Sequence, residues 1–257
     1  MRFPNELGLG PVERWLREQL EAGPVHLTLI DPEKSPGDRA AEVARGAVAA
    51  GSHAILLGGS TGISRELVGE AAKAIRRAVE VPAIIFPEGP GSLAPEASAV
   101  LFMSLLNSRN LELVVRAHAR AAPAVRAMGL EAIPMGYLVV APGMRVGEVG
   151  QVDPVPRDDP GLAAGYALAA EMLGMRLVYL EAGSGAPEPV PVPLVKAVRA
   201  AIRVPLIVGG GIRSAPEARA LLRAGADVLV TGTVTEEQGL GEGFRAIVQE
   251  VRRARSG

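Results

Sequence analysis

Short apolar runs alternate with longer amphipathic segments along most of this chain. The short runs have the length and composition of buried strands, and eight are expected, at residues 25–30, 54–57, 83–86, 100–105, 132–140, 177–181, 206–208 and 228–231. The longer segments predict helices at 38–50, 65–79, 111–128, 161–173, 193–202, 215–223 and 243–254, with one more, 12–21, before the first strand. Strands that alternate with helices in this way form parallel sheets.

The length of the chain favours a closed sheet over an open one. Its 257 residues are close to the usual size of a single α/β barrel, about 250 residues. We therefore predict an α/β fold in which residues 1–257 form a single (β/α)8 TIM-type barrel domain with an extra N-terminal helix.

Two connections depart from the regular alternation. Residues 87–98 are irregular and are expected to lack a full helix, which would modify the barrel near its third helix. Residues 141–159 are rich in Gly, Pro and charged residues, and form either a loop after the fifth strand or a linker between domains. We favour the loop because the alternation resumes unchanged after it. Ser214 and Glu217 predict a capped helix start, and Gly225 predicts its end.

Composition excludes several classes of function. The 27 basic and 28 acidic residues give a net charge of −1, which argues against a dedicated nucleic-acid binder. The chain contains no cysteine, so disulfides, thiolate metal sites and cysteine nucleophiles are absent. His26, His53 and His118 are too scattered for a zinc site. No signal peptide or long apolar run is evident, so we expect a cytoplasmic protein with at most peripheral membrane contact.

Glycine-rich loops follow the last two expected strands. Gly209–Gly211 follow the seventh, and Gly232-Thr233 follow the eighth. These two loops are the usual phosphate-binding site of such barrels, because backbone N–H groups can approach an anion where no Cβ intervenes. The alternative is a plain turn. The pattern predicts a phosphate-bearing ligand, although flavin mononucleotide and sugar phosphates are bound in the same way.

Three polar residues near the first two strand ends point to a cation and a diphosphate. Asp31 ends the first apolar run, and Ser60 follows two glycines after the second. A carboxylate and a hydroxyl suit Mg²⁺, although either residue can instead cap a helix. Lys34 is placed to bind a diphosphate or is an exposed loop charge. Lys73 and Lys196, the other two lysines, fall in expected helices, which gives a Schiff-base mechanism little support.

Glu181 is the strongest catalytic candidate. It ends the apolar run 177–180, so burial should raise the pKa of its carboxyl. A buried carboxylate near a phosphate site is suited to act as a general base. The alternative is a buried ion pair with an arginine.

Five motifs, in order, resemble the geranylgeranylglyceryl phosphate synthase family. They are L-I-D-P-E-K at 29–34, G-G-S at 58–60, Y-L-E-A-G-S-G at 179–185, G-G-G-I-R at 209–213 and T-G-T at 231–233. The resemblance covers roughly residues 25–237 and implies a modified TIM barrel. It also implies that the C3 hydroxyl of sn-glycerol 1-phosphate is joined to geranylgeranyl diphosphate, with release of diphosphate. This reaction is the first ether-bond step of archaeal membrane lipid synthesis.

The resemblance also implies roles for individual residues. Asp31 and Ser60 would hold Mg²⁺, and Glu181 would be the base. The residues that would line the glycerol phosphate are Tyr179, Leu180, Glu181, Ala182, Gly183, Ser184 and Gly185, and those that would hold its phosphate are Gly210, Gly211, Gly232 and Thr233. The segment 102–110 and the long region after the fifth strand resemble the larger, oligomeric branch of the family, which implies a homo-oligomer.

Three other functions remain open at this point. A heptaprenylglyceryl phosphate synthase would share the acceptor site and use a longer donor. A flavin mononucleotide-binding oxidoreductase would use the same phosphate loops. A non-catalytic barrel that binds a phosphate ligand would keep the glycine loops but would need neither Asp31 nor Glu181.

Overall fold

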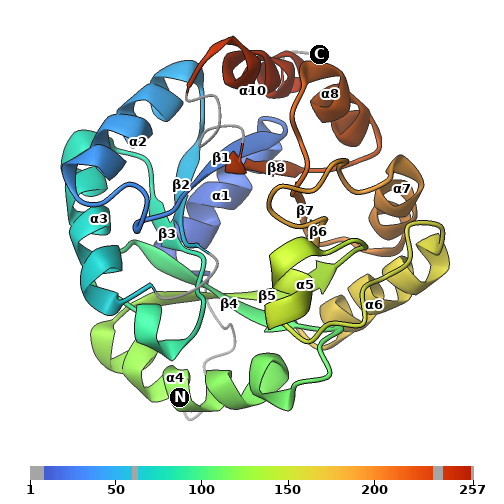
Figure 1. Ribbon diagram of the computed structural model, residues 1–257, viewed down its shortest axis with the longest axis horizontal. Coiled ribbons are helices and arrows are strands. Elements are labelled where there is room, and N and C mark those ends of the chain that lie inside the picture. The colour runs from blue at the N-terminus through green and yellow to red at the C-terminus, as the bar shows by residue number, and fades with distance from the viewer. Residues whose placement is uncertain (1–8, 60–62, 234–239, 256–257) are drawn as a thin grey trace.

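The computed structural model describes residues 9–59, 63–233 and 240–255. Within these ranges, eight parallel strands close into a barrel in chain order (Figure 1). They are β1 Val25–Ile30, β2 Ala54–Leu57, β3 Ala83–Ile85, β4 Ala99–Leu105, β5 Glu131–Val139, β6 Leu177–Glu181, β7 Leu206–Gly209 and β8 Val228–Thr231. The barrel closes because β1 pairs with both β2 and β8. The predicted (β/α)8 barrel is confirmed.

The helices surround the barrel, as Figure 1 shows. They are α1 Pro11–Glu21, α2 Asp38–Ala50, α3 Arg65–Ala78, α4 Ala117–Met128, α5 Met144–Val149, α6 Pro160–Met172, α7 Val192–Ala201, α8 Ala215–Arg223 and α10 Glu242–Arg255. The helix predicted at 111–128 is formed by a π-helical segment, η2 (Glu112–Arg116), followed by α4. In the described part of the chain, no helix is both long and apolar enough to cross a lipid bilayer.

The two irregular connections behave as the sequence predicts. The chain between β3 and β4 contains a single 3₁₀ turn, η1 (Pro90–Ser92), and no α-helix. Residues 141–159 connect β5 to α6, include the short helix α5 and return to the strand end, where the Val155 N–H donates to Val139 O at 3.0 Å. This segment therefore lies at the barrel end where the strands finish.

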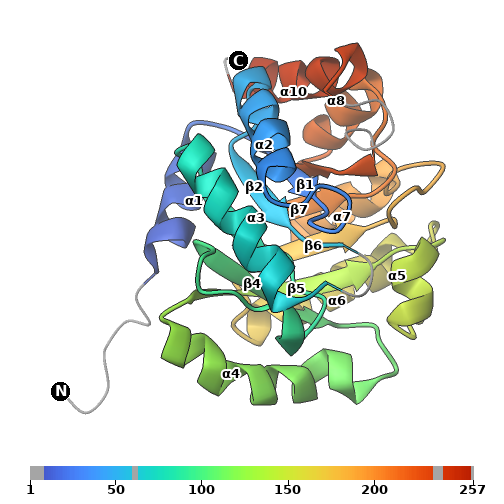
Figure 2. The same ribbon diagram turned by 60° about the vertical axis from the view of Figure 1, so that its left-hand side comes forward.

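Helix α1 covers the opposite end of the barrel. Figure 2 shows α1 and α5 at opposite ends. The carboxylate of Glu131, at the start of β5, accepts the N–H groups of Val12 and Glu13 at 2.7 and 2.8 Å, which caps α1. The fully buried Glu13 carboxylate pairs with Arg176 just before β6, at 2.7 Å. With that end covered, a ligand reaches the barrel from the carboxyl ends of the strands.

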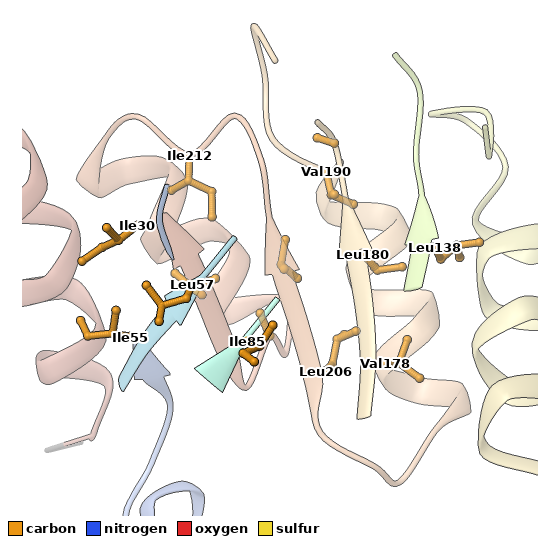
Figure 3. Packing of buried hydrophobic residues seen from close by; sticks show 14 of the residues in the cluster. Ile30, Ile55, Leu57, Ile85, Leu138, Val178, Leu180, Val190, Leu206 and Ile212 are labelled. Atoms are coloured by element: carbon orange, nitrogen blue, oxygen red, sulfur yellow. The ribbon is translucent and has the colours of Figure 1, made fainter. Parts of the chain in front are cut away.

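The hydrophobic core forms two layers because side chains alternate along each strand. On β6, Leu177 and Tyr179 point into the barrel, whereas Val178 and Leu180 pack outward against the helices. Figure 3 shows members of the outer layer, including Leu57 from β2. Burying each large aliphatic side chain of this layer contributes about 1.5–3 kcal/mol. The outer layer thus holds the strands, and with them the strand-end loops, in fixed positions.

Candidate active site

Glu181 lies at the inner wall of the barrel mouth. It is two residues after Tyr179 on β6, so its side chain also points inward, and it is opposite Val139 on β5 and Gly209 on β7. The residue is only 7% exposed. Its Oε1 accepts the Gly183 N–H at 2.7 Å, and its carboxylate also accepts hydrogen bonds from the phenols of Tyr179 and Tyr137. The carboxylate is therefore fixed in orientation by three donors, none of which is an arginine.

The surroundings of Glu181 change its acidity. Burial raises the pKa of the Glu181 carboxyl, and the hydrogen bonds from Gly183, Tyr179 and Tyr137 offset only part of that effect. Burial and the neighbouring carboxylate also raise the pKa of Tyr137 and of Tyr179 well above the usual value, so both phenols stay protonated and act as donors. The raised pKa predicted from sequence is confirmed, and it suits a carboxylate that accepts a proton.

Tyr137 is a site residue that the sequence did not reveal. It faces Tyr179 directly across the β5–β6 pair, and the two rings pack edge to face at 5.1 Å. Phe86, which follows β3, packs edge to face against both rings, at 5.5 and 5.7 Å. These three aromatic residues line the same cavity as Glu181. Only strand register brings Tyr137 to Glu181, and no motif spacing encodes that register.

Asp31 stands on the opposite side of the mouth, directly after β1. It continues the inward-facing series of Leu27 and Leu29 and is 8% exposed. Its Oδ1 accepts the Glu33 N–H at 2.9 Å, and its Oδ2 lies 3.9 Å from Lys34 Nζ. The next helix begins at Asp38 with Gly37 as its N-cap, so the alternative role of Asp31 as a helix cap is wrong.

The loop after β2 lies against Asp31. A Cβ built on Gly59 would be 2.7 Å from Asp31 Oδ2, so the backbone of this loop packs directly on the carboxylate. Gly58, Gly59, Asp31 and Lys34 line one cavity. Ser60, the second predicted magnesium ligand, lies outside the described residues.

The loops after β6, β7 and β8 meet next to Glu181. Gly210 has a left-handed backbone, with φ +79°, and packs against the Glu181 carboxylate and the Gly183 N–H. Thr233 Oγ1 accepts the Gly185 N–H at 3.1 Å and lies 3.1 Å from Ser184 Oγ. This contact joins the end of β8 to the end of β6. The three glycine-containing loops thus converge, as the sequence predicts.

Two features fix the loop after β7. The Ser214 side chain accepts the Glu217 N–H at 3.5 Å, and Glu217 Oε2 accepts the Ser214 N–H at 2.9 Å. These reciprocal bonds form a capping box and confirm the predicted capped start of α8. Gly225 follows α8 with φ +103°, as expected for the residue that ends a helix. Gly211, with φ +70°, precedes this capped start.

Two residues of the predicted acceptor run point elsewhere. Leu180 and Ala182 are buried in the outer core layer, so their side chains do not line the cavity. Their neighbours Tyr179, Glu181 and Ser184 do line it, together with Gly210, Gly232 and Thr233. The alternation of β6 separates a contiguous motif into inward-facing and outward-facing members.

The polar mouth opens into an extended apolar wall. The same cavity that contains Asp31, Lys34 and Glu181 continues over apolar side chains of β3, β4, η2, α4 and α5 and their flanking residues. These are Phe86, Leu93, Val100, Leu101, Met103, Leu113, Ala117, Ala121, Val146 and Val149. One cavity therefore combines the buried Glu181 carboxylate, converging glycine loops and a long apolar surface, which suits a ligand pair that is anionic at one end and hydrocarbon at the other.

The sequence of this chain matches the family model of the PcrB family over residues 13–251. A curated relative from Thermococcus kodakarensis, named geranylgeranylglyceryl phosphate synthase, is 47% identical over 251 residues. The match covers 98% of this chain and 100% of the relative. The chain belongs to the PcrB family of geranylgeranylglyceryl phosphate synthases. The Methanothermobacter thermautotrophicus synthase is 52% identical over 225 residues, covering 88% of this chain and 91% of the relative.

A solved structure of a similar protein has the same architecture. The Thermoplasma acidophilum synthase, determined in complex with its substrate sn-glycerol-1-phosphate, is 45% identical with a TM-score of 0.90, and the match covers 96% of this chain and 100% of that chain. The family resemblance and the fold inferred from the five motifs are confirmed.

Replacing Tyr137 with phenylalanine is expected to move the acid limb of the pH–rate profile to higher pH. The phenol of Tyr137 lowers the pKa of Glu181, so its loss raises that pKa further. A base works only when unprotonated, so activity is then lost at a higher pH as the pH falls. A lost hydrogen bond to a charged group predicts a move of about one pH unit in kcat/KM.

The third tyrosine provides the control for this change. Tyr166 packs against the outer core layer on α6 and does not line the cavity, so Tyr166→Phe should leave the profile unchanged. An acid limb that stays in place in Tyr137→Phe would show that this phenol does not tune Glu181.

Proposed function

We propose that this chain joins the C3 hydroxyl of sn-glycerol 1-phosphate to geranylgeranyl diphosphate and releases diphosphate. This step forms the first ether bond of archaeal membrane lipids. The observation that carries the proposal is the position of Glu181, which is buried in the same cavity as the converging glycine loops and the apolar wall. Membership of the PcrB family and the solved Thermoplasma relative with sn-glycerol-1-phosphate support it.

The acceptor fits beside Glu181. Its phosphate is proposed to bind backbone N–H groups of Gly210, Gly211, Gly232 and Thr233. Gly210, Gly232 and Thr233 line the cavity, and Gly211 directly follows Gly210. The glycerol portion then extends across Tyr179 and Ser184 toward the Glu181 carboxylate. In this pose the C3 hydroxyl lies within hydrogen-bond reach of the base, about 2.6–3.2 Å.

The reaction requires one proton transfer and one exchange of bonds. Glu181 accepts the proton of the C3 hydroxyl while that oxygen forms a bond to C1 of the prenyl donor. The bond between C1 and the diphosphate oxygen breaks, and the diphosphate leaves with the electron pair. Tyr137 and Tyr179 keep the carboxylate oriented as its charge is neutralised. The apolar wall holds the prenyl chain and excludes water from the reacting carbon.

The diphosphate is proposed to lie over Asp31 and Lys34 at the other side of the mouth. The Lys34 ammonium lies 3.9 Å from Asp31 Oδ2, at the edge of the same cavity. From there it can stabilise negative charge on the leaving diphosphate. Asp31 and Lys34, the donor corner of the cavity, are separate from the glycine loops. The diphosphate and the acceptor phosphate therefore have different proposed binding sites.

The residues at this corner fit a magnesium ion. In the described ranges, no group of three or more His, Cys, Asp or Glu is arranged to hold a metal, whereas Mg²⁺ commonly takes one or two carboxylates, waters and substrate phosphates. Asp31 supplies one buried carboxylate at the cavity wall. Asp31 and Ser60 are proposed to hold Mg²⁺, which when bound would neutralise charge on the diphosphate.

Replacing Asp31 with asparagine is expected to raise the Mg²⁺ concentration needed for half-maximal activity by about tenfold or more. The amide keeps the size of the side chain but removes the charge that attracts the cation. A magnesium titration of initial rates measures this, and acceptor affinity measured without metal should stay unchanged. Asp38→Asn is the control, because that carboxylate is exposed at the start of α2. Identical titrations for wild type and Asp31→Asn would exclude Asp31 as a ligand.

We also propose a cytoplasmic homo-oligomer. The face of α6 and its C-terminal end leave Leu162, Met172 and Leu173 between 42% and 78% exposed. An exposed apolar group of this kind often marks a contact between protein chains. Sedimentation analysis tests the oligomeric state.

The proposed activity has a direct test. The protein is incubated with Mg²⁺, labelled sn-glycerol 1-phosphate and prenyl diphosphates of increasing length, and organic-soluble label is measured. Product with the C20 donor is expected. A preference for a C35 donor would favour heptaprenylglyceryl phosphate synthesis, and a yellow purified protein without transferase activity would favour the flavin-binding oxidoreductase.

A further inference from the structure

The long connection after β5 supplies Val146 and Val149 to the apolar wall, and its first residues pack on the loop after β6. Gly143, at the start of this connection, donates its N–H to Ala182 O at 3.2 Å. Gly183 packs so closely against it that a Cβ on Gly183 would lie 2.6 Å from Gly143 O and 2.7 Å from Met144 Cβ. The connection therefore rests directly on the loop that gives its N–H to Glu181.

Arg157 ties this connection to the next loop of the mouth. Its Nη1 donates to Ala141 O at 3.2 Å, in its own connection. Its Nη2 donates to Pro189 O at 3.1 Å and to Glu188 Oε2 at 2.8 Å, both in the loop between β6 and α7. The guanidinium thus joins two loops through backbone carbonyls, and its side chain is 32% exposed.

The loop between β6 and α7 contacts Gly211, which belongs to the proposed phosphate site. A Cβ on Gly211 would lie 2.5 Å from the Glu188 carbonyl carbon and 2.8 Å from Pro189 N. The backbone at 188–189 is therefore in close contact with Gly211. A displacement of this loop toward Gly211 would shift Gly211 as well, because the two backbones are closely packed.

We propose that Arg157 is a positioning residue for acceptor binding. It does not line the cavity. Its planar fork of donors holds the 188–189 backbone against Gly211 and holds the start of the β5–α6 connection over Gly183. The inference rests on the proposed function, because it takes Gly211 as part of the acceptor phosphate site. A lysine cannot reproduce the fork, because its single ammonium does not supply the same fixed donor geometry.

The Arg157–Glu188 ion pair contributes less to holding the two loops than the hydrogen bonds to backbone carbonyls do. Glu188 has a side chain that is 72% exposed, and exposed ion pairs contribute little to stability. The two carbonyl contacts, with Ala141 and Pro189, are those that hold the loops. Glu188→Ala should therefore behave like wild type, whereas Arg157→Ala should not.

The test measures binding of sn-glycerol 1-phosphate by calorimetry, together with KM for both substrates and Tm. Arg157→Ala is expected to weaken acceptor binding about tenfold, the effect of losing charge-assisted hydrogen bonds that hold the loop. Arg157→Lys should have an intermediate effect. KM for the prenyl diphosphate and kcat should change less than about threefold. The contacts of Arg157 are with Ala141, Glu188 and Pro189, and include neither α5, which carries Val146 and Val149 of the apolar wall, nor Asp31, Lys34 or Glu181.

Arg109→Ala is the matched control. Arg109 pairs with Asp153 at 3.3 Å, and Asp153 belongs to the same connection, but both side chains are about 70% exposed and neither contacts the loop at 188–189. This variant should bind the acceptor as wild type does.

The outcomes separate this inference from the proposed function. Equal acceptor affinity in wild type and Arg157→Ala, or equal losses for acceptor and donor, would overturn the positioning role. A loss in Glu188→Ala as large as that in Arg157→Ala would also overturn it, since the carbonyl contacts would then be irrelevant. If Arg157→Ala does not fold, the split between acceptor and donor in Arg157→Lys decides. A wild-type protein that fails to bind sn-glycerol 1-phosphate would overturn the proposed function itself.

Discussion

Replacing Glu181 with glutamine is expected to lower kcat by about 10²–10⁴-fold, the usual contribution of a general base. Glutamine keeps the size of the side chain, and its amide oxygen can still accept the Gly183 N–H, but it cannot take the proton of the attacking hydroxyl. Burial in the barrel mouth, which raises the pKa of this carboxyl, is the feature that suits it to the role.

The comparison is made by single-turnover measurements at saturating substrates across a range of pH. Wild-type rates should fall as the pH decreases through the raised pKa of Glu181, whereas the slow rate of Glu181→Gln should be flat there. Acceptor affinity and Tm serve as controls and should change little, because the phosphate loops provide most of the binding. Equal rates in a folded variant would return Glu181 to a structural role.

Replacing Gly210 with alanine is expected to reduce kcat/KM by about 100-fold, the scale of loss when reacting groups are misplaced by about 1 Å. A Cβ at this position would overlap the Glu181 carboxylate and lie 2.7 Å from Gly183 N. The methyl group would therefore displace both the base and the donor that fixes it. It would also narrow the approach of the acceptor phosphate to the backbone.

Gly174 offers a matched control for the backbone conformation. It has φ +85°, close to the +79° of Gly210, but a Cβ there meets nothing within 4 Å. Both alanine variants should lose about 1–2 kcal/mol of stability from the left-handed conformation, and Gly210→Ala should lose more because its Cβ also overlaps the Glu181 carboxylate. Only Gly210→Ala should lose activity. Comparable activity losses in the two variants would show that backbone strain, rather than contact with Glu181, explains the effect.

Much of the fold could be predicted because its determinants are local. Runs of four to seven apolar residues identified strands such as β2 and β6, and Ser214 with Glu217 identified the start of α8. The missing helix at 87–98 was visible as a loss of periodicity. Glu181 is recognisable as a candidate because it ends an apolar run, where burial of a carboxylate is unfavourable unless the residue has a specific role.

The remaining details depend on contacts between distant segments. Tyr137 reaches Glu181 only through the register of β5 on β6, and Arg157 meets Pro189 only after two loops fold together. Motif matching also treated residues 179–185 as one unit, although strand alternation sends the Leu180 side chain outward. Side-chain direction and register are properties of the assembled sheet, so a single sequence shows them poorly.

A crystal structure of this chain with sn-glycerol 1-phosphate tests the proposed mechanism most directly. The phosphate should contact backbone N–H groups at Gly210, Gly211 and Gly232–Thr233, and the C3 hydroxyl oxygen should lie within about 3.2 Å of a Glu181 carboxylate oxygen. A phosphate bound at the Asp31 corner, or a C3 hydroxyl pointing away from Glu181, would contradict the proposed assignment of base and acceptor site.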